Sequence, residues 1–116
     1  IEHWRKVAIA ACEQCGRNRI PQIAEMVPLK YFTDKAEHDT LRLMLSPGGG
    51  LSLKQLKYQG GEIILLVGAE GGFAPEEEQA ARAAGFTLVT LGQRVLRTET
   101  AGLAALAAMQ TLWGDF

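Results

Sequence analysis

The sequence of 116 residues predicts an α/β fold, in which a parallel β-sheet is flanked by helices on both faces. Helical and strand-like patterns alternate along the chain. Residues 62–67 form a nearly continuous aliphatic run, which is typical of a strand buried on both faces of a parallel sheet. Glycine-bearing loops follow two successive strands, at residues 67–73 and 91–97. Because ligands bind at the carboxyl edge of open α/β sheets, the sequence predicts a pocket between these loops.

The first part of the chain predicts two helices and a strand. Residues 3–15 show the apolar spacing of a half-buried helix, and Gly16 fits its C-terminal end. The segment 28–35 opens with proline, which suits the first turn of a short helix. Residues 40–45 predict a strand, and the Ser-Pro-Gly-Gly-Gly segment 46–50 ends it.

The second part predicts a further strand-and-helix alternation. A short helix is expected over 52–56, before the aliphatic strand. A helix then begins at Pro75, with three glutamates in its first turn, and ends before Gly85. Residues 86–91 predict the next strand and 98–113 the last helix, whose many small residues let it lie close to other backbone.

Composition places few limits on function. Hydrophobic residues make up 47% and charged residues 22%, as in an ordinary globular domain. The net charge of −1 gives no sign of nucleic-acid binding by the chain as a whole. The sequence contains no run of 18 apolar residues, so it predicts no membrane helix, and its first residues do not resemble a signal peptide. The cytoplasm is therefore the expected compartment. Since the chain starts without Met and inside a helical pattern, we expect a fragment of a longer protein.

The loop 67–72, Val-Gly-Ala-Glu-Gly-Gly, has the features of a ligand-binding turn. Glycines let the backbone approach a ligand closely, and the following helix offers free N–H groups. The loop is neither a Walker A sequence nor a Gly-x-Gly-x-x-Gly fingerprint. A tight strand-to-helix turn that binds nothing is the alternative, and Glu70 then caps the next helix or is solvated.

The second loop places the apolar residues Val95 and Leu96 between Arg94 and Arg97. A plain surface turn uses Asn, Asp, Ser or Pro, so the apolar pair is expected to be buried against a ligand or the chain itself. Two arginines can hold a carboxylate or a phosphate in bidentate fashion. The alternative is that the arginines pair with glutamates of the same region, Glu70 or Glu99.

Cys12 and Cys15 form a Cys-x-x-Cys pattern, which raises the question of zinc or redox chemistry. A closed zinc site needs four ligands. His3 and His38 do not have the spacing of a zinc module. We therefore expect no metal, and cysteines that pack as small hydrophobic residues.

Three separated motifs together resemble the bacterial 16S rRNA uridine-N3 methyltransferase family. They are Ala-Ala-Cys-Glu-Gln-Cys-Gly-Arg-Asn-Arg-Ile-Pro at 10–21, Val-Gly-Ala-Glu-Gly-Gly-Phe at 67–73, and Leu-Gly-Gln-Arg-Val-Leu-Arg-Thr-Glu-Thr-Ala at 91–101. This family belongs to the SPOUT class of S-adenosylmethionine enzymes, and the resemblance covers essentially the whole chain. It implies a trefoil knot at the C-terminus, a homodimer, and a cofactor held bent between the knotted loops.

The resemblance also implies roles for individual residues. The cofactor is expected on three loops, through Leu45, Ser46, Pro47, Val67, Gly68, Glu70, Gly71, Gly72, Leu91, Gly92, Arg94, Val95 and Leu96. Arg97 and Arg94 are expected to stabilise charge on the uracil oxygens, while Glu99 is a candidate base or orients an arginine. Arg17 and Arg19 are expected to contact phosphate of small-subunit rRNA. N3 lies on the pairing edge, so the target base must be unpaired or flipped out.

The chain departs from the family pattern in several places. Ala69 stands where the family usually has proline, and Ser46 where related sequences often have histidine. The resemblance implies that the family's RNA-binding barrel and the first strand and helix of its catalytic domain lie outside residues 1–116, so we expect these residues to form an incomplete SPOUT domain. Three alternatives stay open: a SPOUT 2′-O-ribose methyltransferase, a non-catalytic RNA-binding or dimerisation module, and an ordinary Rossmann nucleotide-binding domain. The final loop of the ribose methyltransferases is usually rich in Ser, Leu and Asn, and residues 96–100 differ from that pattern.

Overall fold

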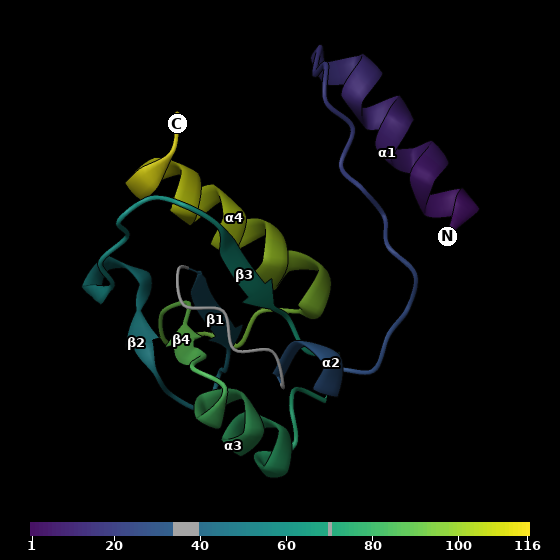
Figure 1. Ribbon diagram of the computed structural model, residues 1–116. Helices are drawn as coiled ribbons and strands as arrows, with labels where there is room; N and C mark the ends of the chain where they lie inside the picture. Colours follow the sequence, from purple (N-terminus) through teal and green to yellow (C-terminus); the bar gives the residue numbers. More distant parts are fainter. Residues whose placement is uncertain (34–39, 70) are drawn as a thin grey trace. The chain divides into compact units, whose positions relative to one another are not determined.

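The computed structural model describes residues 1–33, 40–69 and 71–116 (Figure 1). The chain divides into two compact units, Ile1–Tyr31 and Phe32–Phe116. Each unit is described by itself.

The first unit consists of helix α1 (Glu2–Cys15), an irregular segment that follows it, and the first two residues of the short helix α2, which crosses the boundary between the units. The predicted helix is confirmed, and it ends at Gly16, which adopts a φ of 75° and closes the last turn by donating its N–H to the Cys12 carbonyl. The expected half-burial is wrong in this unit, since the Trp4 and Val7 side chains are 61% and 46% exposed. The irregular segment contacts the helix through the Arg5 guanidinium, which donates to the Ile23 carbonyl, but offers no helix or strand to cover the apolar face.

The second unit contains a four-stranded parallel sheet in the order β2-β4-β1-β3. Its strands are β1 (Leu41–Leu45), β2 (Leu51–Ser52), β3 (Ile63–Leu66) and β4 (Thr87–Thr90). This confirms the predicted α/β class with a parallel sheet. The two-residue strand β2 was not predicted, because so short a strand has no alternation to detect.

The helices that follow α1 agree with the prediction in position more than in length. The expected helix 28–35 begins two residues later than predicted, as α2 (Lys30–Thr33), so Pro28 does not open it, and positions 34 and 35 lie outside the described residues. The short helix expected over 52–56 is a 3₁₀ turn, Leu53–Gln55, in which the Gln55 side chain accepts the Ser52 N–H at 2.8 Å. The two long helices are α3 (Pro75–Ala83) and α4 (Thr98–Trp113).

The most buried strand is β1, not the aliphatic run that the sequence analysis singled out. Residues 42–45 are buried, whereas all four residues of β3 are only half-buried. The cause is topology: β1 lies between β3 and β4, and β3 lies at the edge of the described sheet.

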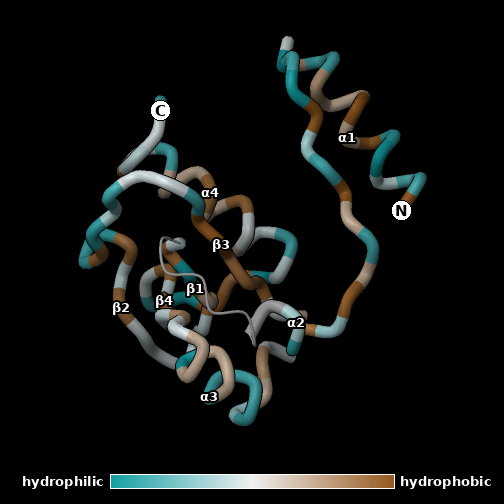
Figure 2. The backbone as a smooth tube through the Cα atoms, viewed as in Figure 1, coloured by the Kyte–Doolittle hydropathy of each residue, from teal (hydrophilic) through white to brown (hydrophobic). Residues whose placement is uncertain are grey.

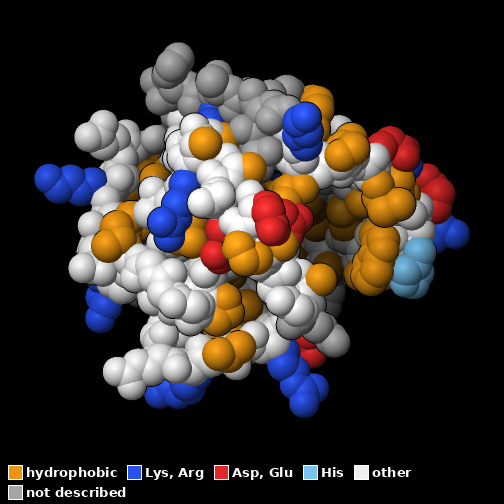
Figure 3. Space-filling view, turned by 90° about the horizontal axis from the view of Figure 1, so that it is seen from below, with side chains coloured by type: hydrophobic (Ala, Val, Ile, Leu, Met, Phe, Trp, Pro, Cys, Tyr) orange, Lys and Arg blue, Asp and Glu red, His pale blue; other side chains and the backbone are white. Residues whose placement is uncertain are grey.

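Apolar clusters cover both faces of the sheet. Because side chains alternate along a strand, Leu43 and Leu45 lie on the face of α4, with its Ala105 and Met109, and Met44 lies on the opposite face. That opposite face packs against Ala81 of α3, together with Phe86 and Leu88. Figure 2 shows the hydrophobic character concentrated along the strands and α4, and Figure 3 shows further hydrophobic side chains exposed between charged ones.

Arg42 is a buried cation that the sequence analysis did not single out. Its side chain is 6% exposed, its guanidinium donates to the Ala84 carbonyl, and its Cζ lies 5.9 Å from the centre of the Phe86 ring. It therefore ties the central strand to the C-terminal end of α3.

Replacing Arg42 with alanine is expected to lower the free energy of unfolding by about 2 kcal/mol, because it removes stem packing and leaves the Ala84 carbonyl without this donor. Urea titration of both variants measures the effect, with Arg42→Met as a partial control that keeps the stem and should lose about 1 kcal/mol. An alanine variant as stable as the parent would show that Arg42 does not support the fold.

None of the described helices is long and apolar enough to cross a membrane.

Candidate functional site

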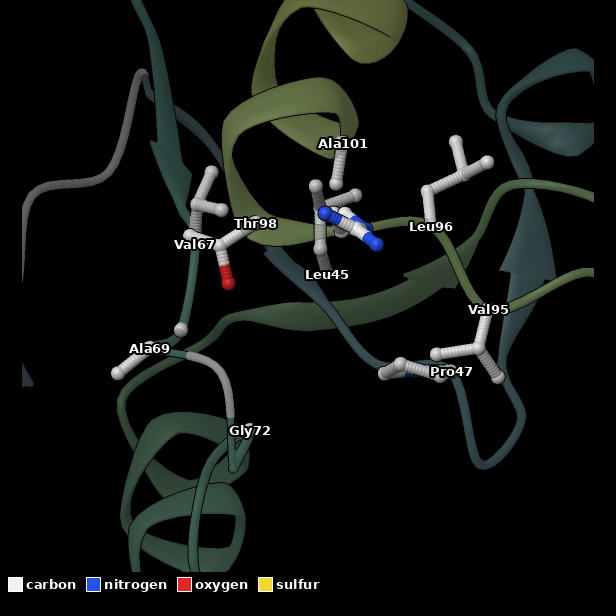
Figure 4. Close-up of a pocket in the computed structure, with 11 residues that line it drawn as sticks. Leu45, Pro47, Val67, Ala69, Gly72, Val95, Leu96, Thr98 and Ala101 are labelled. Carbon is white, nitrogen blue, oxygen red and sulfur yellow. The ribbon is translucent and has the colours of Figure 1, made fainter.

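A cavity of about 510 Å³ opens at the carboxyl ends of the central strands (Figure 4). It exists because β3 and β1 are neighbours in the sheet and β4 is the other neighbour of β1, which brings the three following loops together. The lining residues come from these loops and the start of α4: Leu45, Pro47, Val67, Gly68, Ala69, Gly72, Val95, Leu96, Arg97, Thr98 and Ala101. The predicted pocket at this edge is confirmed.

The loop after β3 brings bare backbone to the cavity. A Cβ atom on Gly68 would lie 3.2 Å from the backbone carbon of Gly72 and 3.3 Å from the Phe73 ring. Gly72 adopts a φ of 74° and donates its N–H to the Ala69 carbonyl at 2.8 Å, so the turn forms with alanine in the place of proline. Glu70, expected to bind a cofactor or to cap α3, lies outside the described residues.

The loop after β4 presents apolar side chains to the cavity. Leu96 is half-buried, but Val95 is 76% exposed, so the chain itself does not bury Val95, and its burial against a ligand stays a prediction. Gly92 adopts a φ of 75° at the start of this loop, and Figure 4 shows Val95 and Leu96 among the side chains that line the cavity. Cavities that bind small molecules are commonly lined by such apolar side chains.

Arg97 and Arg94 line two neighbouring hollows of the site. Arg97 lines the large cavity, and Arg94 lines a small hollow next to it, together with the half-buried Leu91. No described carboxylate lies within ion-pair distance of either guanidinium, so the alternative of pairing with Glu99 is wrong in the described chain. Pairing with Glu70 falls outside the described residues.

A second hollow of about 450 Å³ adjoins the cavity. It shares four lining residues with the cavity and adds polar groups from α3 and from the segment that follows β1. Its lining is Leu45, Ser46, Pro47, Gly48, Gly49, Gly71, Gly72, Phe73, Glu78, Arg82, Leu88 and Val95. Ser46, one of the expected cofactor residues, lies here and not in the large cavity.

The polar centre of the second hollow is a Ser46–Glu78 hydrogen bond. The Ser46 hydroxyl, in a residue that is 5% exposed, donates to Glu78 Oε2 at 2.7 Å. Glu78 carries no local sequence signal that sets it apart from the other glutamates of this turn, but the structure shows it half-buried. Glu77, one residue before it, instead caps α3 by accepting the Ala74 N–H at 2.8 Å. Ser46 and Glu78 are 32 residues apart in the sequence, so no local sequence pattern indicates that they meet.

Other predicted residues do not line the site. Glu99 is exposed on the first turn of α4 and does not line the large cavity. Arg17 and Arg19 are exposed in the first unit. Cys12 is buried as expected, whereas Cys15 is exposed because it lies at the last turn of α1. Within residues 1–33, 40–69 and 71–116, no group of three or more His, Cys, Asp or Glu side chains is placed to hold a metal, and His38 lies outside these residues.

The sequence and the structure of this chain are both similar to those of RNA methyltransferases. The family described as RNA methyltransferase domain matches residues 1–110. The ribosomal RNA small subunit methyltransferase E of Buchnera aphidicola subsp. Acyrthosiphon pisum is 37% identical over the whole chain, which spans 46% of that relative. The protein of the same name from a Synechocystis species is 36% identical over 97% of the chain and 39% of the relative.

Two solved structures are also similar. The ribosomal RNA small subunit methyltransferase E of Neisseria gonorrhoeae, bound to S-adenosyl methionine, has a TM-score of 0.95 and 46% identity, and the match covers 99% of this chain and 48% of that one. Lpg2936 of Legionella pneumophila, in complex with SAM, has a TM-score of 0.89 and 40% identity, covering 96% and 46%. The chain thus spans about half the length of these proteins.

Proposed function

Because this chain belongs to the RNA methyltransferase domain family, we propose that it forms the cofactor-binding part of an S-adenosylmethionine-dependent enzyme that methylates N3 of a uridine in small-subunit (16S) ribosomal RNA. The observation that carries the proposal is the cavity built from the three expected loops. Its support is the likeness to a 46% identical protein of the same fold that was solved with S-adenosyl methionine.

The residues of the cavity fit the cofactor. A volume of about 510 Å³ lies in the range of small-molecule sites, and the walls are mostly apolar. The close approach of Gly68 to Gly72 provides the bare backbone that an adenosine or a methionine group can contact, and Val95 and Leu96 provide apolar surface. When bound here, S-adenosylmethionine supplies an activated methyl group on its sulfonium.

The chain's own residues then have defined tasks. N3 of uracil carries a proton at neutral pH, so the site must help to remove it or stabilise the developing anion. Arg97 at the cavity and Arg94 beside it stabilise negative charge on the uracil oxygens, and neither guanidinium is taken up by a described carboxylate. Glu99 is the weaker candidate for the base, since it does not line the cavity. Arg17 and Arg19 contact phosphate.

The proposal extends to assembly and environment. The enzyme is a homodimer with a C-terminal trefoil knot, and it acts in the cytoplasm on the ribosomal small subunit without a metal. Exposed apolar residues on α4 and after it support pairing of two copies, since Leu103 is 70% and Phe116 is 76% exposed. Segments outside this chain would supply the RNA-binding barrel.

Calorimetric titration with S-adenosylhomocysteine, with ATP and NAD as controls, tests the cofactor assignment. Selective binding of S-adenosylhomocysteine is expected. Incubation with S-adenosylmethionine and small ribosomal subunits, followed by nucleoside analysis of the rRNA, tests the product. N3-methyluridine is expected, whereas a 2′-O-methyl nucleoside would replace the proposal by the ribose methyltransferase alternative, and no binding by the protein that carries this chain would favour a non-catalytic module.

Replacing Gly68 with alanine is expected to weaken S-adenosylhomocysteine binding by about 10-fold, because the new Cβ meets the Gly72 backbone and forces the loop to shift. Calorimetry measures the change. The matched control is Gly102→Ala on α4, whose Cβ would lie 3.8 Å from the Val67 side chain, an ordinary contact. Equal affinities for the Gly68 variant and the parent would contradict the placement of the cofactor against this loop.

A further inference from the structure

We propose that the second hollow receives the base that is methylated, and that Glu78 selects uracil by accepting its N3–H. The inference rests on the proposed function, because it places the RNA base next to the proposed cofactor cavity. The two hollows share the lining residues Leu45, Pro47, Gly72 and Val95, so a group in one lies directly against a group in the other. Methyl transfer requires this adjacency.

The walls of the second hollow suit a flat, flipped-out base. Backbone of Gly48, Gly49, Gly71 and Gly72 lines it, so no side chain occupies these parts of the wall. Phe73 is half-buried and adds an aromatic side chain, the kind of group on which extruded bases stack. The volume of about 450 Å³ is ample for a pyrimidine.

The Glu78 carboxylate is held in place from behind. Ser46 fixes it through the 2.7 Å bond to Oε2, and Ser46 is itself fixed by burial and by donating its N–H to the Val89 carbonyl at 2.8 Å. Arg82 follows four residues later on α3, a spacing at which Glu and Arg often pair, yet no ion pair joins them. The carboxylate thus faces Ser46 and the hollow, and Oε1 is left as a hydrogen-bond acceptor.

A carboxylate in this position distinguishes the two pyrimidines. Ionised, it only accepts hydrogen bonds. Uracil presents a donor at N3, whereas N3 of cytosine is an acceptor and would face the carboxylate unpaired and repelled. A site built to pair a buried polar group rejects the analogue that cannot pair with it. Arg82 at the rim of the hollow adds positive charge for the RNA backbone.

The test compares two short single-stranded RNAs that differ only in a central uridine or cytidine. Their affinities for the protein that carries this chain are measured by fluorescence anisotropy with S-adenosylhomocysteine present. We expect the uridine RNA to bind about 10-fold more tightly than the cytidine RNA. In Glu78→Gln the ratio should fall below about 2-fold, because an amide offers a donor as well as an acceptor.

Two further variants sharpen the result. Glu76→Gln makes the same chemical change on the exposed first turn of α3, away from the hollow, and should keep the parent ratio. Ser46→Ala removes the hydroxyl that fixes the carboxylate and should lower the ratio to between the parent and Glu78→Gln values.

The outcomes separate this inference from the proposed function. An unchanged ratio in Glu78→Gln, or a parent that binds both RNAs equally while still binding S-adenosylhomocysteine, overturns the role of Glu78 and leaves the cofactor assignment intact. A parent that does not bind S-adenosylhomocysteine overturns the proposed function itself.

Discussion

Replacing Arg97 with alanine is expected to lower the rate of methyl transfer by about 100-fold, while the affinity for S-adenosylhomocysteine changes by less than about 3-fold. Arg97 lines the cavity that adjoins the second hollow and has no described carboxylate partner, so its charge is available to a base held next to the cofactor. Loss of a positioned donor that stabilises charge mainly in the transition state affects the rate far more than ground-state binding. Single-turnover transfer to small ribosomal subunits and calorimetry measure the two quantities.

The matched control for Arg97 is Lys57→Ala, which removes one positive charge from an exposed position of the same unit that does not line the cavity. Its transfer rate should stay within about 2-fold of the parent, since distant surface charges act weakly. If Arg97→Ala lost rate and affinity to the same extent, the residue would bind the cofactor and have no separate role in the reaction.

Replacing Gly50 with alanine is expected to lower the free energy of unfolding by about 3 kcal/mol, the largest stability effect of any single change proposed. A Cβ there would lie 2.7 Å from the carbonyl carbon of Leu88 and still closer to its oxygen, and the φ of 154° is itself unfavourable for a side chain. Gly50 directly precedes β2, so the clash would push β2 away from β4. Urea unfolding of parent and variant measures the difference.

Gly48→Ala is the control for this stability effect. Its Cβ would meet nothing within 4 Å, and Gly48 does not have a positive φ. We expect a change of no more than about 0.5 kcal/mol. A Gly50 variant that unfolds at the same urea concentration as Gly48→Ala would show that the close contact with Leu88 relaxes without cost.

Local patterns in the sequence were enough to predict most helices and strands. The periodicity of residues 3–15 and 98–113, the proline that opens α3, and the alternation of strands and helices predict the elements that the structure contains. The glycine-bearing loops, placed after strands, also predicted where the cavity lies. These features depend on residues close together in the chain, so the sequence displays them directly.

Tertiary structure alone decided which of these parts meet. The strand order placed β1 at the centre and β3 at the edge, so an equally apolar run became half-buried. In the folded chain Ser46 donates a hydrogen bond to Glu78, the buried Arg42 donates to the Ala84 carbonyl, and Val95 is exposed at the cavity. Ser46 and Glu78 are 32 positions apart, and Arg42 and Ala84 are 42 apart, so their contacts depend on how the helices and strands pack together. Hydrophobic periodicity indicates only which face of an element is buried, not which element covers it.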